Sequence, residues 1–225
     1  MKSETTMGIV LRRTDYGEAD RIVQFCTPLG KRSAMARGVR KPKSKLAGGI
    51  ELLSESSIVL RKGKGELFTL GQARMAAFYK NILADYDRLQ FAYEALRHVA
   101  RASEMADGDE WYTILQETLK GLDDTTTSLA LVKAWFFVQY AQVLGEELPL
   151  YRDIQGEKIA AGVHYTYDVA NKGLRADERG DMNENHIKLL RVMSQKPLRV
   201  VRNVGGVQEF IAVCASVAVR HASVS

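Results

Sequence analysis

KRSAMARGVRKPKSK, residues 31–45, carries seven basic side chains and no acidic one. Pro42 has no backbone donor and biases Lys41 toward an extended conformation, which disfavours one continuous helix. Gly38 suits the end of a strand or a tight turn. We therefore predict a strand over residues 31–37, followed by a mobile basic loop over residues 39–45.

A positive loop beside a strand is suited to binding phosphate groups. The alternative is a solvated charged loop that binds nothing. The charge distribution favours phosphate binding, because residues 1–75 hold fifteen Lys and Arg against seven Asp and Glu, a net charge of +8. The other residues sum to −3. This asymmetry predicts a polyanion-binding module joined to a more neutral one.

The chain has 225 residues and is 46% hydrophobic, which allows one large domain or two small ones with a buried core. Cys26 and Cys214 are far apart and belong to no CxxC or CxxH pattern, so we expect neither a disulfide framework nor a cysteine zinc site. Because no disulfide is expected, we infer that the protein is located in a reducing compartment. The chain shows no signal peptide and no apolar run near the roughly 20 residues of a membrane helix, so we expect a cytoplasmic protein without membrane association.

Alternating apolar residues and turn signals predict five short strands in the first third of the chain. They cover residues 7–13, 21–25, 31–37, 51–62 and 66–70. Gly or Pro occurs in the turns around residues 16–18, 27–30 and 63–65. Five short strands with such turns are typical of a small antiparallel barrel or sandwich.

The apolar period changes from two to 3.6 near residue 75, which predicts domains at residues 1–75 and 76–225. From Met75 onward a helical stripe runs through Phe78 and Ile82, with a break near Asp85. Further helices are predicted over residues 111–122, 126–144, 183–194 and 204–222. The helical pattern is absent from residues 150–182, which predicts a small segment of β structure between the helices, here called the β excursion.

Signatures of catalysis are lacking in the sequence. Its four histidines are not at metal-ligand spacing, and neither GxSxG nor HExxH occurs. Gly63 and Gly65 join two strands, whereas a P-loop opens a helix. A nuclease or phosphodiesterase that uses Asp15, Glu18 and Asp20 remains an alternative, although a two-metal site needs more converging carboxylates. We expect a protein that is not an enzyme, with no catalytic residue, metal or cofactor.

Five segments and their spacing resemble one known family. They are GIVL from Gly8, YGEADRIV from Tyr16, TPLGK from Thr27, ARGVRKPKSKLAG from Ala36 and RKGKGELFTL from Arg61. Together they resemble RecO, a family of bacterial DNA-repair proteins that mediate recombination. The resemblance is dense over residues 8–73. It implies an α+β protein with an N-terminal five-stranded OB-fold barrel followed by an α-helical domain.

The resemblance also implies a function. It implies binding to single- and double-stranded DNA, annealing of complementary strands, and partnership with RecR and the single-stranded-DNA-binding protein SSB. Together these help load RecA on SSB-coated DNA, in the bacterial cytoplasm at the nucleoid. Many relatives carry a four-cysteine zinc element that begins CxxCG. Here residues 152–156 read RDIQG, so we expect a metal-free β excursion.

We expect the DNA backbone to be contacted by the basic loop and by cations that flank it. These residues are Lys31, Arg32, Arg37, Arg40, Lys41, Lys43, Lys45, Arg61, Lys62 and Lys64. Tyr16 is a candidate for stacking on bases, whereas Phe25 and Phe68 are interpreted as core residues. An RNA-binding OB-fold protein that acts in translation or RNA handling remains the alternative function.

The C-terminal tail of SSB is acidic and ends in an apolar residue, so its receptor needs a basic group beside an apolar pocket. We expect this site on the helical domain. Its candidate residues are Arg97, Arg101, Lys133 and Phe137. The alternative is that the aromatic residues near Lys133 are core and that Lys133 is solvated.

Overall fold

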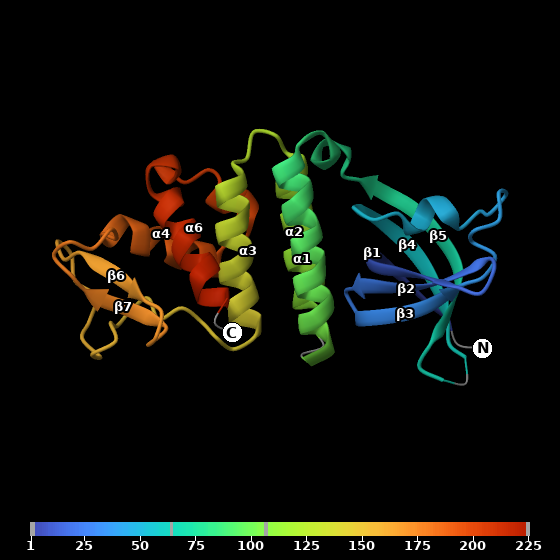
Figure 1. The fold of residues 1–225 in the computed structure, drawn as a ribbon, viewed down its shortest axis with the longest axis horizontal. Helices are drawn as coiled ribbons and strands as arrows, with labels where there is room; N and C mark the ends of the chain where they lie inside the picture. The colour runs from blue at the N-terminus through green and yellow to red at the C-terminus, as the bar shows by residue number, and fades with distance from the viewer. Residues whose placement is uncertain (1–2, 64, 106–107, 224–225) are drawn as a thin grey trace. The chain divides into compact units, whose positions relative to one another are not determined.

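The computed structural model describes residues 3–63, 65–105 and 108–223. The chain forms two compact units, Met1–Asp123 and Asp124–Ser225. Figure 1 shows a barrel of strands in the first unit, and helices with a small sheet in the second. Each unit has its own core.

Five strands of the first unit close into a barrel (Figure 1). They are β1 (Ser3–Tyr16), β2 (Asp20–Thr27), β3 (Gly30–Ala36), β4 (Ser54–Arg61) and β5 (Phe68–Phe78). The order around the barrel is β1-β2-β3-β5-β4, and β3 and β5 pair in parallel while the other neighbours are antiparallel. This five-stranded barrel is an OB-fold, and it confirms the predicted fold class.

Alternate residues of the strands fill the barrel. Val10, Val23, Phe25 and Ile58 are fully buried in its interior. Phe68 is half-buried and packs against the same core. Phe25 and Phe68 are therefore core residues, as predicted, because a small barrel needs apolar side chains in its interior.

The middle of the outer face of β1 is buried as well, because two helices pack on the barrel. These helices are α1 (Tyr86–Met105) and α2 (Glu110–Asp123), and both contact β1. Ile9 and Leu11 alternate with the interior residue Val10 and are buried too. The compact unit that contains the barrel thus continues beyond residue 75, where the sequence period changes.

The predicted helical stripe from Met75 begins too early. β5 continues to Phe78 because it pairs along its length with β4, with Arg74 opposite Ser57 and Phe78 opposite Ser54. A 3-10 helix, η2 (Lys80–Ala84), follows, and α1 starts only after Asp85. The Asp85 carboxylate accepts hydrogen bonds from the backbone N–H groups of Asp87 and Arg88, which is the pattern of an N-cap.

A buried carboxylate joins α2 to the barrel. Glu55 of β4 is 6% exposed and accepts hydrogen bonds from Tyr79, Tyr112 and Gln116. Burial and the neighbouring carboxylate raise the pKa of both phenols, so they remain protonated donors. A carboxylate with its acceptor sites filled in this way is tolerated inside a protein.

The second unit is built around α3 (Leu129–Val143), which packs against α6 (Val207–Ser223) and α4 (Glu184–Gln195). The Ser128 hydroxyl caps α3 by accepting a hydrogen bond from the Leu131 N–H at 3.2 Å. A short helix, α5 (Leu198–Val201), lies between α4 and α6 in sequence. The β excursion contains the antiparallel pair β6 (Tyr165–Asp168) and β7 (Gly173–Ala176).

Residues 152–157 form a hydrogen-bonded loop, at the place where many relatives of the resembled family carry a zinc element and where a metal-free segment is predicted for this chain. The Asp153 carboxylate accepts hydrogen bonds from the N–H groups of Gln155 and Glu157, each at 2.9 Å. The Asp153 N–H donates to the Glu157 carbonyl at 2.9 Å, and Arg152 donates to the Gly156 carbonyl at 2.6 Å. Side-chain oxygen and backbone bonds therefore close this loop without thiolates.

We expect Asp153→Ala to lower the free energy of unfolding by about 1 kcal/mol, because two backbone donors lose their acceptor. For a chain of this size the midpoint of thermal unfolding should fall by about 2 to 4 °C. Glu157→Ala is the matched control, because it leaves the backbone bonds in place. EDTA should leave the midpoint unchanged. A midpoint that falls with EDTA, or a stoichiometric zinc in untagged protein, would contradict the metal-free loop.

Candidate nucleic-acid interface

The basic loop, defined as residues 37–45, follows β3 as a series of turns. The Lys41 N–H donates to the Gly38 carbonyl at 3.1 Å, and the Ser44 N–H donates to the Lys41 carbonyl at 3.0 Å. Gly38 has φ of +62°, a conformation that glycine adopts without strain. The loop predicted from the sequence is thus organised by its own backbone.

Val39 anchors the loop in the barrel. Its side chain is 3% exposed and belongs to the barrel core. Burial of a valine contributes about 1.5 to 3 kcal/mol. Two exposed cations repel each other by only about 1 kcal/mol even at 4 Å in water. Burial of this one apolar residue therefore outweighs any single repulsion between charges of the loop.

Polar contacts tie the loop to the turn between β1 and β2. The Gly38 N–H donates to the Asp20 carboxylate at 2.7 Å. The Arg40 N–H donates to the Ala19 carbonyl at 2.9 Å, and its guanidinium donates to the Gly17 carbonyl at 3.2 Å. Arg40 is therefore a structural residue of the loop as well as a cation.

The other cations of the loop face solvent. Arg37, Lys41, Lys43 and Lys45 are all exposed. Within the described ranges, none of these four is in an ion pair. Their charge is available to an external anion, and a phosphate backbone is the anion that an array of such cations fits.

Two of the nearby acids accept hydrogen bonds from the loop or from residues next to it. Asp15 accepts a hydrogen bond from Arg21 at 2.7 Å and lies 3.5 Å from Arg40. The Arg21 hydrogen bond, with the charge of Arg40, lowers the pKa of Asp15. Asp15 and Asp20 thus have structural partners, while Glu18 is exposed. Among the described residues, no group of three His, Cys, Asp or Glu could hold a metal ion.

Lys31 and Arg32 have partners inside the first unit. Lys31 donates to the Glu104 carboxylate at 2.8 Å and to the Ala100 carbonyl at 3.3 Å, both on α1. Its hydrogen bond lowers the pKa of Glu104. Arg32 forms an ion pair with Glu4 at 3.4 Å. These two cations join parts of the fold, whereas the loop cations face solvent.

The strand register separates Arg61 and Lys62 from the basic loop. Arg61 pairs with Ser3 at the start of β1, whereas the loop is bonded to the turn that follows the end of β1. Arg61 and Lys62 are exposed and form a second basic group at the other end of this strand. Lys64 lies outside the described residues. Apart from Lys31 and Arg32, the sequence-predicted DNA contacts that the structure describes therefore fall into two groups rather than one surface.

The residues proposed for the SSB tail belong to different units. Arg97 and Arg101 are exposed on α1 of the first unit, whereas Lys133 and Phe137 are on α3 of the second. Phe137 is only 4% exposed, and Trp135 and Phe136 are also buried. The aromatic cluster is therefore part of the core, which was the alternative left open by the sequence.

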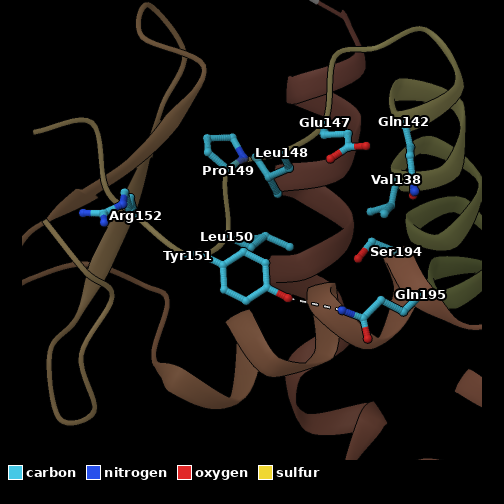
Figure 2. A pocket seen from close by; sticks show the side chains of 10 residues that line it. All are labelled: Val138, Gln142, Glu147, Leu148, Pro149, Leu150, Tyr151, Arg152, Ser194 and Gln195. Carbon is cyan, nitrogen blue, oxygen red and sulfur yellow. Dashed lines mark hydrogen bonds between the residues drawn. The ribbon is translucent and has the colours of Figure 1, made fainter. Parts of the chain in front are cut away.

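The second unit has a hollow of about 540 Å³ elsewhere on α3. Figure 2 shows Val138 and Gln142 of α3 on one side, residues 147–152 on the other, and Ser194 and Gln195 below them. The Arg191 guanidinium donates a hydrogen bond to the Leu150 carbonyl, and its Cζ lies 4.6 Å from the ring centre of Tyr151. This hollow was not predicted from the sequence, because Ser194 and Gln195 are far in the chain from the other residues that line it.

Comparison with known proteins identifies the family. The family model described as "Recombination protein O N terminal" matches residues 1–79. A protein of Roseiflexus sp. (strain RS-1) named "DNA repair protein RecO" is 30% identical over 203 residues, 87% of this chain and 71% of that protein. The chain belongs to the RecO family, which confirms the resemblance seen in the sequence.

Proteins with the same name from Bacillus cereus (strain AH187) and Bacillus anthracis are each 37% identical over 128 residues. The match covers 54% of this chain and 51% of each Bacillus protein, so the chain spans about half of their length. None of the helices in the described ranges combines the length and apolar character that crossing a bilayer requires.

We expect Asp20→Ala to loosen the basic loop, because the Gly38 N–H loses its acceptor. Amide hydrogen exchange of residues 38–45 should accelerate about fivefold, which corresponds to a loss of about 1 kcal/mol. Glu18→Ala removes the same charge from the same turn without removing a described contact, and it should leave exchange unchanged. Equal exchange in both variants would show that Asp20 does not hold the loop.

Proposed function

We propose that this protein acts in DNA repair and recombination by binding the backbones of single- and double-stranded DNA through its basic loop. The observation that carries the proposal is the set of exposed cations held on a closed barrel by Val39, Asp20 and Arg40. Five-stranded OB-folds commonly bind oligonucleotides. The names of the relatives support the same assignment.

We also propose that the protein anneals complementary strands. Two phosphate backbones repel each other, and cations that neutralise both reduce this barrier. The loop needs neither ATP nor a metal to act in this way, so the proposed activity is not enzymatic. Cooperation with RecR, and delivery of RecA to SSB-coated DNA, are the partnerships we propose for the whole protein.

Annealing of SSB-coated complementary oligonucleotides, without ATP or metal, tests the function directly. Rapid duplex formation above the spontaneous rate is the expected result. Because phosphate contacts do not by themselves distinguish DNA from RNA, matched RNA strands should be measured in parallel. A clear preference for RNA would favour an RNA-binding role, and metal-dependent shortening of the strands would favour a nuclease.

Replacing Lys41, Lys43 and Lys45 with alanine should weaken DNA binding with little change in stability, because these side chains are exposed and lack described ion pairs. For single strands, loss of three phosphate contacts should flatten the logarithmic salt slope by about two units. Titration of labelled strands at several salt concentrations measures both effects. Arg40 is left intact because it also holds the loop.

Arg61→Ala with Lys62→Ala is the comparison for the triple variant. If the two basic groups bind DNA independently, this pair should flatten the slope by about one unit. Unchanged affinity and slope in the triple variant would exclude the basic loop as the DNA site. Unchanged binding in the pair alone would restrict the site to the loop.

We propose that the helical part of the chain binds the acidic SSB tail. Lys133→Glu should weaken binding of a tail peptide about tenfold while binding to bare DNA stays nearly unchanged, because a charge reversal replaces attraction by repulsion. Fluorescence anisotropy of a labelled peptide measures this. Arg97→Glu and Tyr151→Ala test α1 and the hollow of Figure 2 in the same assay. Unchanged affinity in Lys133→Glu would remove this residue from the site.

A further inference from the structure

Tyr16 is the last residue of β1 and lies beside the basic loop. Tyr16 is 56% exposed. The next residue, Gly17, accepts the hydrogen bond from the Arg40 guanidinium at 3.2 Å. The exposed ring of Tyr16 and the guanidinium of Arg40 are therefore both located at the turn that follows β1.

The strand register places Tyr16 on the outer face of the barrel. Thr14 pairs with Ile22 of β2, and Ile22 pairs with Met35 of β3, so these three residues share one face. Tyr16 is two residues beyond Thr14 and points to the same face. Val23, next to Ile22, belongs to the barrel interior, so the shared face is the outer one.

This face has an open end and a covered end. Ile22 and Met35 are only half-buried, so apolar surface is accessible close to Tyr16. Farther along the same strands, Ile9 and Cys26 are buried, and Lys31 is bonded to α1. The helices therefore confine the accessible part of the face to the end that adjoins the basic loop.

Charge on this end suits a polyanion with flat apolar groups. Arg12 is exposed on the same face, because it pairs with Gln24. Asp20 also lies on this face, but its carboxylate accepts the Gly38 N–H, and Asp15 is bonded to Arg21. Glu18 is the exposed acid of the turn. The exposed cations of the basic loop outnumber this one acid.

We propose that Tyr16 is a base-stacking residue that, with Ile22 and Met35, receives unpaired bases while the basic loop holds the adjacent phosphates. This inference rests on the proposed DNA binding and deepens it, because it assigns this end of the barrel to single strands. Bases in a duplex are stacked on each other and present no free face to a side chain. Stacking on an aromatic ring contributes to binding of single strands irrespective of sequence.

The test compares three ligands with the same phosphate charge. They are a single-stranded oligonucleotide, a strand of equal length made of abasic sites, and a duplex with half as many base pairs. Tyr16→Ala should weaken binding of the normal single strand by about tenfold, within the range known for loss of one stacked base. Binding of the abasic strand and of the duplex should change less than about twofold, and the salt slope should stay constant, because no phosphate contact is lost.

Two variants control for structural damage. Tyr16→Phe keeps the ring and should bind like the unchanged protein. Tyr86→Ala removes a tyrosine that is 77% exposed at the start of α1 and belongs to neither the proposed stacking group nor the basic loop, so it should have no effect on any ligand. Tyr16→Trp should bind the normal strand and lose part of its added indole fluorescence on binding, but not with the abasic strand.

The outcomes separate the two proposals. Equal losses on normal and abasic strands would show that Tyr16 acts through the loop, and would overturn the stacking role. No loss on the normal strand would overturn it as well. If the unchanged protein binds none of the three ligands at moderate salt, the proposed function itself fails, and the stacking role fails with it.

Discussion

The pairing register of β1 is the constraint on which the arrangement of the candidate site depends. The first half of β1 pairs with β4, and its second half pairs with β2. Because side chains alternate between the two faces, a slip by one residue would exchange the interior and the surface of the barrel. The same register separates the two basic groups and places Tyr16, Ile22 and Met35 on one face. A site with few direct contacts between its members is thus positioned by backbone hydrogen bonds.

A loop that is proposed to bind phosphates has to keep its charges unpaired and still hold its shape. Acids that paired with Lys41, Lys43 or Lys45 would hold the loop but would cancel the charge that attracts a polyanion. Here the loop is held mainly by groups that leave these lysines free of described ion pairs: the Val39 side chain in the core and backbone N–H groups. Asp20 binds an N–H group and not a lysine. The stability of the loop and its proposed binding of phosphates therefore use different atoms.

The helices α1 and α2 limit which part of the barrel can meet a ligand. Glu55 and its three donors join α2 to the barrel at buried or half-buried positions, and Lys31 bonds the exposed Glu104 of α1. Loss of one donor to Glu55 would leave a buried polar group unsatisfied, at a cost of about 1 to 3 kcal/mol. The covered end of the face is therefore a stable part of the first unit. The end that remains accessible is the one where the loop and Tyr16 lie.

The sequence by itself determined the short-range features. Alternation and Gly or Pro turns located all five strands, the 3.6 period located α2, α3, α4 and α6, and the run of cations located the basic loop. Only the tertiary structure decided that Lys31 pairs with Glu104, that β5 extends to Phe78, and that Arg61 lies apart from the loop. The sequence pattern predicted a mobile loop, although Val39, an apolar residue among cations, is a sequence signal that could have indicated its anchoring in the core. Strand register and helix packing join residues far apart in sequence, and such contacts depend on which surfaces close together, which no local pattern specifies.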